Sequence, residues 1–298
     1  EVLKRALLSH KIFVGGNLGN AMAEALNGAF DIAVLEVSSF QAERLKNAEL
    51  DFGILLNLET DHLDRYDTLR DYFSAKWNLL HHSKTIFYPS NVERALSERE
   101  SAALYSNTEN LQFLLKKVVE SLARFLDFKV TDGLFEKLPT LPHRQEFYRA
   151  PGNRIFVNDS KATTVHASLY ALKEMRTLPH ALHLILGGKD KGDDYKKFIP
   201  ELRPTDHLYF CGPAGDRIDA ELQNFGGLKR RFPTLKACLE SVLPILPEAS
   251  CLLLSPACSS YDEFKNFEER GRFFLEQVHK QFSLEKDHID SHREKPLS

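Results

Sequence analysis

Two groups of polar residues follow apolar runs in the first part of the chain. Glu36 follows the apolar run 31–35, and His62 lies in a charged group that follows the run 52–58. If both runs are parallel strands, their carboxyl ends share the sheet edge at which such sheets bind ligands. A carboxylate at that edge suits a hard cation such as Mg²⁺, which takes few protein ligands. From the residues alone, Glu36 is either a metal ligand or the cap of a following helix, and His62 is either a ligand or a surface group.

Three similar groups follow apolar runs in the second half of the chain. They are NDSKAT at residues 158–163, GGKDK at 187–191 and SPACSS at 255–260. An acidic residue after a strand can hydrogen-bond ribose hydroxyls, and a lysine can neutralise phosphate. Turn chemistry explains any one group equally well. Because every group follows a predicted strand, together they favour an active site at the carboxyl edge of a sheet.

Other candidate groups are weaker when taken alone. Lys76 lies in an amphipathic segment, where a lysine normally faces solvent. The glycine-rich residues 15–19 form either an oxyanion cradle or a tight turn. These 298 residues contain neither G-x-G-x-x-G nor G-x-x-x-x-G-K-[ST], which argues against a dehydrogenase. Cys258 has no histidine nearby, so we expect a small buried thiol and not a nucleophile.

Composition excludes several classes of protein. The chain has 298 residues, with 39 basic and 42 acidic side chains and a net charge of −3, which disfavours a nucleic-acid binder. The sequence contains no long uncharged apolar stretch, so it predicts no membrane span. The 4 cysteines lack CxxC spacing and are expected to be reduced thiols of a cytoplasmic protein. No signal peptide is visible at the first residue, Glu1.

Continuous apolar runs alternate with helical patterns, which predicts an α/β fold with parallel sheets. Strands are expected at residues 12–14, 31–35, 52–58, 85–88, 155–157, 182–186, 207–210 and 251–254. Helices are expected at 21–26, 45–48, 69–81, 110–126, 165–175, 195–199, 216–223, 235–242 and 267–280. A proline-containing linker separates a first domain, 1–140, from a second, 141–283, and the charged residues 284–298 predict a loose tail.

Several blocks of the sequence, taken in order, resemble the Mur ligases. The matching blocks are GGNLGN (15–20), LEVSSFQ (35–41), LNLETDHLDRY (56–66), YFSAK (72–76), LPHR (141–144), NDSKATT (158–164), LGGKDKG (186–192) and SPACSSYDEFKNFEERG (255–271). They cover most of the chain, and the last block resembles the family member that adds D-glutamate.

This resemblance implies a truncated central ATPase-type domain with a parallel sheet, followed by a C-terminal Rossmann-like domain that binds the amino acid. The implied activity is a magnesium- and ATP-dependent amide ligation in peptidoglycan synthesis, which serves cell wall biogenesis, cell shape and division. The expected substrates are UDP-N-acetylmuramoyl-L-alanine and D-glutamate, which react through an acyl phosphate. A cytoplasmic monomer with no nucleic-acid or membrane partner is expected.

The resemblance also implies roles for individual residues. Glu36 and His62 correspond to the Mg²⁺ ligands, and Lys76 to the lysine that the family carbamylates, so these three residues are the expected catalytic and metal-binding set. The residues expected at ATP are Asn107, Asn110, Arg144, Asp159 and Lys161. The residues expected at the other substrates are Asn17, Ser38, Gln41, Thr163, Lys191, Ser260 and Phe267.

The sequence departs from the family pattern in ways that affect function. The family's phosphate loop and N-terminal uridine-nucleotide domain are not among these 298 residues, and the segment 77–106 is short. Lys189 and Asp190 replace what is often a small or acidic pair. We therefore expect the complete parent protein to be the ligase and this chain alone to lack turnover. The alternatives are a folylpolyglutamate-synthase-like ligase and a non-catalytic remnant or binding module.

Overall fold

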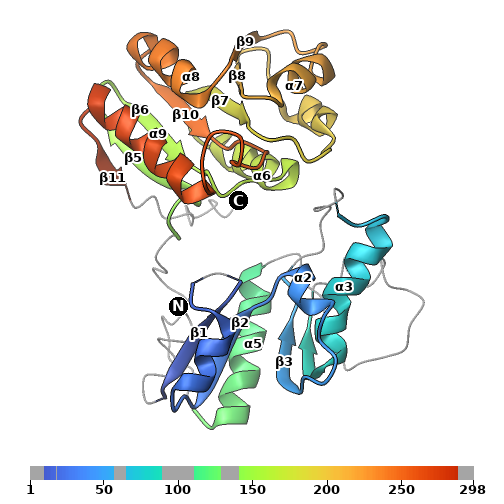
Figure 1. Cartoon of the computed structure of the whole chain (residues 1–298). Coiled ribbons are helices and arrows are strands. Elements are labelled where there is room, and N and C mark those ends of the chain that lie inside the picture. Colours follow the sequence, from blue (N-terminus) through green and yellow to red (C-terminus); the bar gives the residue numbers. More distant parts are fainter. Residues whose placement is uncertain (1–9, 18, 57–64, 89–110, 129–140, 288–298) are drawn as a thin grey trace, which may run out of the picture. The chain divides into compact units, whose positions relative to one another are not determined.

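The structure, a computed structural model, describes residues 10–17, 19–56, 65–88, 111–128 and 141–287 (Figure 1). The chain divides into two compact units, Glu1–Leu138 and Pro139–Ser298. The division lies in the proline-containing segment in which the sequence placed a linker, two residues before the predicted boundary. Each unit is an α/β structure, as predicted. Among the described helices, none is long and apolar enough to cross a membrane.

Two parallel strand pairs form the described part of the first unit. β1 (Ile12–Gly16) pairs with β2 (Ile32–Glu36), so that Gly16 lies opposite Glu36. β3 (Leu50–Ile54) pairs with β4 (Ser83–Phe87). Each of these four strands overlaps a predicted run, but β3 ends at Ile54, so the predicted continuation of this strand through residues 55–56 is wrong, and residues 57–58 lie outside the described residues. Because β1 and β2 run in one direction, the glycine-rich turn after β1 lies beside the carboxylate that ends β2.

Helices cover both faces of the β3–β4 pair. Successive side chains of a strand point to opposite faces, so neighbouring residues of β4 pack against different helices. Ile86 packs with Leu80 and Trp77 of α3 (Leu69–His81). Phe87, the next residue of β4, packs with Val118 and Leu122 of α5 (Leu111–Leu126). The 3.6-residue spacing of apolar side chains predicted both helices. Lys76 is therefore carried by a helix that is anchored to the strand pair.

A short helix, α2 (Ser39–Ala42), forms where the sequence analysis did not expect one. The Ser38 hydroxyl accepts the Gln41 N–H at 3.3 Å, and the Ser38 N–H donates to Gln41 Oε1 at 2.9 Å. This capping box satisfies the first turn of α2. The predicted helix at 45–48 is wrong. The helical turn begins after the polar cap at Ser38 and not at the apolar residues that follow α2. The first unit also has a 3₁₀ helix, η1 (Met22–Asn27).

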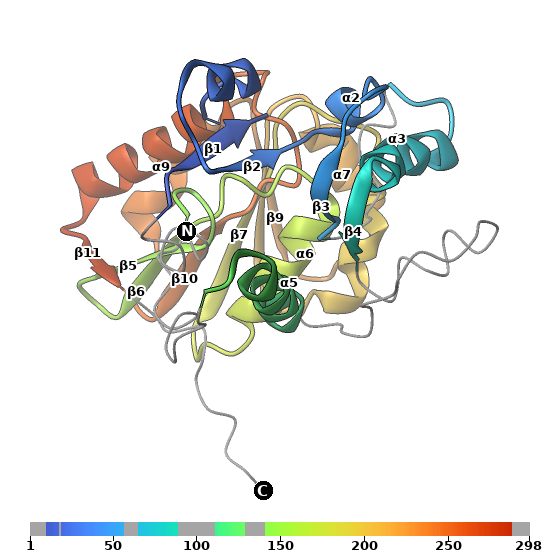
Figure 2. The same cartoon turned by 90° about the horizontal axis from the view of Figure 1, so that it is seen from below.

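A sheet in the order β11-β5-β6-β10-β7-β8-β9 forms the centre of the second unit (Figure 2). Its strands are β5 (Glu146–Ala150), β6 (Arg154–Asn158), β7 (Ala181–Gly187), β8 (His207–Cys211), β9 (Leu228–Phe232), β10 (Ser250–Leu254) and β11 (Glu285–Asp287). The five strands from β6 to β9 are parallel, whereas β5 and β11 are antiparallel additions at one edge. The tail predicted to be loose from residue 284 is therefore ordered at β11, because β5 offers it an unpaired edge.

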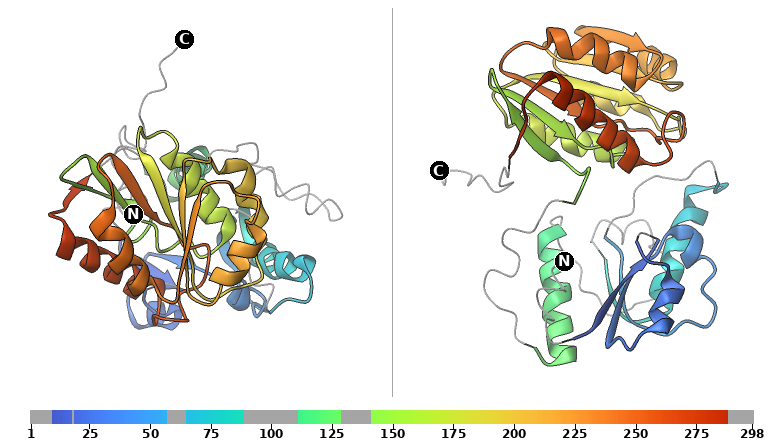
Figure 3. Two further views of the ribbon diagram at one scale, coloured as in Figure 1. Left: turned by 90° about the horizontal axis from the view of Figure 1, so that it is seen from above. Right: turned by 60° about the vertical axis from the view of Figure 1, so that its left-hand side comes forward.

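Helices cover both faces of this sheet, in the manner of a Rossmann-like domain (Figure 3). One face packs against α6 (Val165–Met175) and α7 (Gly215–Glu221). The other packs against α8 (Leu235–Val242) and α9 (Phe267–Gln281). Two 3₁₀ helices complete the unit, η2 (Tyr195–Glu201) and η3 (Leu243–Ile245). The loops that leave the parallel strands consequently emerge at one edge, where the predicted site residues of this unit gather.

Candidate active site

Three loops at the carboxyl ends of neighbouring strands bring together the polar groups of the second unit. The strand order β6-β10-β7 places the loops 159–164, 255–260 and 188–193 side by side. Backbone hydrogen bonds join them. The Asp159 N–H donates to the Leu254 carbonyl at 2.9 Å, and the Ala257 N–H donates to the Ala162 carbonyl at 3.0 Å. The three loops thus form one continuous surface at the sheet edge.

Asp159 is a buried carboxyl group at the start of this surface. Its side chain accepts the Ser255 hydroxyl at 2.7 Å and the Gln145 N–H at 3.2 Å. Burial raises the pKa of Asp159 to about 7, although these hydrogen bonds and the nearby Arg144 oppose the rise. The carboxyl group is therefore partly protonated near neutral pH. In that form it can both donate to and accept from a ligand hydroxyl.

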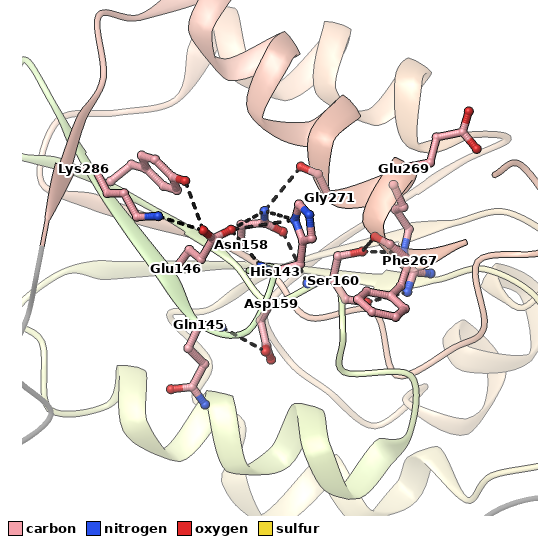
Figure 4. A network of polar contacts seen from close by, with 12 residues as sticks. His143, Gln145, Glu146, Asn158, Asp159, Ser160, Phe267, Glu269, Gly271 and Lys286 are labelled. Atoms are coloured by element: carbon pink, nitrogen blue, oxygen red, sulfur yellow. Dashed lines mark hydrogen bonds and ion pairs between the residues drawn. The ribbon is translucent and has the colours of Figure 1, made fainter. Parts of the chain in front are cut away.

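A buried polar network holds the segment around Arg144 (Figure 4). Glu146, which is 5% exposed, accepts the His143 N–H at 2.8 Å, Asn158 Nδ2 at 3.2 Å and Lys286 Nζ at 3.0 Å. Lys286 comes from β11, a strand that the sequence analysis did not predict. Arg144 itself stays exposed between these anchors. The network thus ties the backbone on either side of Arg144 to the sheet.

Asn158 extends the same network to α9. Its Nδ2 atom lies 2.9 Å from His143 Nδ1 and 3.3 Å from the Gly271 carbonyl. Burial lowers the pKa of His143, so its ring is neutral near pH 7 and Nδ1 accepts a hydrogen bond. A Cβ at Gly271 would lie 2.3 Å from His143 Nδ1, so only glycine allows α9 to approach this closely.

Arg270 is a buried cation that sequence analysis did not single out. It is 3% exposed, and Nε donates to Ser160 Oγ at 3.0 Å while Nη1 donates to the Cys258 carbonyl at 3.1 Å. Burial lowers the pKa of Arg270 to about 10, so it remains charged at neutral pH. The loop after β6 is thereby tied to the loop after β10. The only signal in the sequence was its place within the matching block 255–271.

Lys161 and Phe267 were assigned to different ligands but lie together. Lys161 Nζ is 4.1 Å from the centroid of the Phe267 ring. The Phe267 carbonyl accepts the Ser160 hydroxyl at 2.8 Å, which fixes the start of α9 against the loop after β6. The attraction between a cation and an aromatic face holds the ammonium group at this place on the ring. The pair is therefore suited to a site that holds an anionic group.

Thr163, Lys191 and Ser260 lie one on each of the three loops. Thr163 follows Lys161, whose carbonyl accepts the Thr163 N–H at 2.9 Å. Ser260 is buried, whereas Lys191 is half-buried in the loop after β7. The structure thus brings these predicted residues to the same sheet edge as Asp159 and Lys161.

All four cysteines are free, which agrees with the prediction of reduced thiols, and all four are buried, as predicted for Cys258. Burial raises the pKa of the Cys258 thiol to about 12. Cys258 is therefore a neutral thiol in a closed environment and not an activated nucleophile.

In the first unit, the predicted residues occupy the ends of β1 and β2 and the middle of α3. Asn17 Nδ2 lies 3.5 Å from Glu36 Oε1, so an amide and a carboxylate stand together at the strand ends. Ser38 and Gln41, expected at the substrate, bond to each other in the capping box of α2. Lys76 Nζ lies 4.8 Å from the centroid of the Tyr72 ring.

A magnesium site in the first unit depends on residues that the structure does not describe. His62, Asn107 and Asn110 lie outside the described residues. Within the described residues, no three histidine, cysteine or acidic side chains gather in a metal-binding group. Glu36 nevertheless supplies a carboxylate, the kind of oxygen ligand that Mg²⁺ prefers, at the end of β2. This carboxylate therefore fits a magnesium ion whose other protein ligands come from residues that the structure does not describe.

Two domain families match the chain in succession. Residues 16–122 match the Mur ligase middle domain, and residues 143–258 match the Mur ligase, glutamate ligase domain. A UDP-N-acetylmuramoylalanine--D-glutamate ligase of Aliivibrio fischeri is 31% identical over 314 residues, which cover 92% of this chain and 69% of that protein. The enzyme of the same name from Geotalea daltonii is 29% identical over 307 residues, which cover 88% of this chain and 67% of that protein.

Solved structures share the fold. The MurF ligase of Thermotoga maritima in complex with ADP superimposes with a TM-score of 0.66 at 16% identity, over 94% of this chain and 76% of that one. A MurF structure from Acinetobacter baumannii gives a TM-score of 0.67 at 12% identity, over 93% of this chain and 73% of that one. At these identities the likeness concerns the fold alone.

Proposed function

Because this chain belongs to the Mur ligase family, we propose that its residues serve the ATP-dependent ligation of D-glutamate to UDP-N-acetylmuramoyl-L-alanine in peptidoglycan synthesis. One observation carries the choice of substrates. Eight relatives that are 27–31% identical over about nine tenths of this chain are named for that reaction. The aligned residues cover 67–70% of the length of those relatives.

The proposed reaction has two steps. The terminal phosphoryl group of ATP passes to the carboxylate of the UDP substrate, giving an acyl phosphate and ADP. The amine of D-glutamate then attacks the acyl carbon and loses a proton, and inorganic phosphate leaves. Both steps concentrate negative charge, so catalysis depends on placing cations and hydrogen-bond donors around the reacting groups.

In this proposal the second unit binds ATP and the amino acid. Lys161 and Arg144 neutralise phosphate, and the buried Asp159 bonds the ribose hydroxyls. Arg144 acts from a segment held by the Glu146 network, which limits its freedom. Lys191 holds a carboxylate of D-glutamate. The residues proposed to complete the amino-acid site are Thr163, Ser260 and Phe267, and those proposed at the adenine are Asn107 and Asn110.

The first unit is proposed to hold Mg²⁺ and the UDP substrate. Glu36 and His62 would hold the ion, which supplies charge neutralisation during phosphoryl transfer. Lys76 would become a further oxygen ligand by carbamylation, in which its neutral amine adds CO₂ and releases a proton. Asn17, Ser38 and Gln41 are proposed to contact the UDP substrate.

Product formation from the three substrates tests this function. The complete translated polypeptide is assayed by phosphate release with D-glutamate and, separately, with L-glutamate. We expect turnover with D-glutamate only. Turnover with L-glutamate alone would instead favour a folylpolyglutamate-synthase-like ligase. No turnover with either amino acid would favour a non-catalytic binding module and contradict the proposal.

The 298-residue chain provides an internal comparison. It contains no G-x-x-x-x-G-K-[ST] loop, whose backbone amides and lysine hold the β- and γ-phosphates. We therefore expect no ligase turnover from the purified 298-residue chain. Product formation by that chain would show that another group of residues replaces the loop. Reading the coding sequence upstream of Glu1 in frame tests directly for the motif.

A further inference from the structure

A pair of side chains on α7 holds both ends of the loop that carries Lys191. Arg217 Nη1 donates to Asp190 Oδ2 at 2.7 Å, and Nη2 donates to the Asp193 carbonyl at 2.6 Å. Arg217 Nε donates to Glu221 Oε1 at 2.8 Å, and Glu221 Oε2 accepts the Tyr195 N–H at 2.8 Å. One helix therefore bonds to the chain before Lys191, at Asp190, and after it, at Asp193 and Tyr195.

The Tyr195 hydroxyl forms a second attachment beneath the same loop. It donates to Asp190 Oδ1 at 3.0 Å, and the Gly192 N–H donates to that oxygen at 2.9 Å. Cys258 Sγ lies 3.0 Å from the Tyr195 oxygen. The hydroxyl has one hydrogen, which Asp190 receives, so the Cys258 thiol is the donor in the remaining contact. Burial raises the pKa of both Tyr195 and Cys258, which keeps both hydrogens in place.

These contacts also join the loop after β7 to the loop after β10. Lys189 and Ser259 exchange two backbone hydrogen bonds, of 2.9 and 3.1 Å. The Tyr195 hydroxyl connects Asp190 of the first loop with Cys258 of the second. Asp190, which precedes Lys191, and the Asp193 carbonyl, which follows it, are thus held by bonds from outside the loop. A chain fixed on both sides of a residue leaves only the side chain of that residue to adjust.

We propose that Tyr195, Asp190 and Arg217 are positioning residues that hold the Lys191 ammonium where it meets a carboxylate of the amino-acid substrate. The proposal rests on the proposed function, because it takes Lys191 as a substrate-binding residue. It adds that selection of an acidic amino acid depends on a hydrogen-bonded cluster beneath the loop. None of the three residues is assigned contact with the substrate.

Removal of one hydroxyl tests this proposal. Tyr195 is fully buried, so Tyr195→Phe keeps the packed ring and removes only the bond to Asp190 and the bond from Cys258. The matched control is Asp219→Asn, which breaks the 2.6 Å ion pair with Lys229 elsewhere on α7. Both variants are made in the complete translated polypeptide. Initial rates are measured while each of the three substrates is varied in turn.

We expect Tyr195→Phe to raise the KM for D-glutamate about tenfold, the effect of losing one charge-assisted hydrogen bond. The KM values for ATP and for UDP-N-acetylmuramoyl-L-alanine should not change, and Asp219→Asn should leave all three unchanged. Asp190→Asn, which keeps the shape of the side chain, should repeat the selective effect. It also serves as the test if the Tyr195→Phe protein does not fold.

If the unaltered polypeptide turns over D-glutamate, two results would overturn the inference. One is an unchanged KM for D-glutamate in Tyr195→Phe and Asp190→Asn. The other is an equal rise of all three KM values, which would indicate general loss of structure. Failure of the proposed function is a separate result, because the unaltered polypeptide itself would then show no turnover with D-glutamate. That result would remove the premise and overturn the inference with it.

Discussion

Asp159→Asn is expected to make the second unit more stable at alkaline pH and to weaken the dependence of its stability on pH. The carboxyl group is 4% exposed, and burial raises its pKa from 3.8 to about 7. A carboxyl with a raised pKa binds its proton more tightly in the folded state. Its contribution to stability is therefore fully present below the unfolded pKa and is lost as the pH rises through the folded value.

The size of the effect follows from the two pKa values. The interval between 3.8 and about 7 corresponds to a loss of about 4 kcal/mol in the free energy of unfolding between acidic and alkaline pH. Between about pH 5 and about pH 8 the loss is about 3 kcal/mol, because part of it has already occurred below that range. Asparagine does not ionise, and its single side-chain oxygen can accept the Gln145 N–H as Asp159 Oδ1 does. The amide nitrogen that replaces Oδ2 cannot accept the Ser255 hydroxyl and would donate to the hydroxyl oxygen instead. The variant should therefore lack this loss.

The assay must report on the second unit. The single tryptophan, Trp77, belongs to the first unit, so its fluorescence reports on the wrong one. Urea unfolding followed by pulsed hydrogen exchange and mass spectrometry gives the stability of β10, a fully buried strand beside β6. Unaltered and Asp159→Asn proteins are compared at about pH 5 and about pH 8, so that the contributions of other titrating groups cancel.

The reasoning would be refuted by a stability difference between the two proteins that stays constant across the pH range. That result would mean that Asp159 has the same pKa folded and unfolded. A difference that grows in the opposite direction, with the variant less stable at alkaline pH, would mean that the hydrogen bonds outweigh burial.

Two further substitutions test the packing of the second unit by the same unfolding measurement. Arg176→Met leaves Asp206, which is 2% exposed, without the partner that donates to Oδ1 at 2.7 Å, and we expect a loss of about 3 kcal/mol. Gly187→Ala places a Cβ 2.0 Å from the Cys211 carbonyl oxygen, at a residue whose φ is +126°. We therefore expect β7 and β8 to separate and the unit to lose most of its stability. The control Gly226→Ala adds a Cβ in open space and should have little effect. Equal stability of the Gly187 and Gly226 variants, or an unaltered unfolding free energy in Arg176→Met, would contradict these expectations.

Local patterns predicted the parts of the fold that depend on nearby residues. The bounds of α6 and α8 agree with the prediction, because Thr164 and Thr234 cap their first turns and apolar residues follow at helical spacing. The strands at and next to the sheet edges, β5, β9 and β11, were missed, because they contain charged residues and lack a continuous apolar run. A strand at a sheet edge takes its identity from its neighbour, which the local sequence does not reveal.

The sequence by itself determined the α/β class, the order of most elements, the family resemblance and the placement of polar groups after strands. Each follows from residue types within a short window. Only the tertiary structure joined Arg270 to Ser160, 110 positions away, and Lys286 to Glu146, 140 positions away. It also decided that Asp159 is buried enough to hold a proton near neutral pH and that Tyr195 lies beneath the Lys191 loop. Burial and long-range hydrogen bonds depend on which strands become neighbours, and residue spacing along the chain does not contain that information.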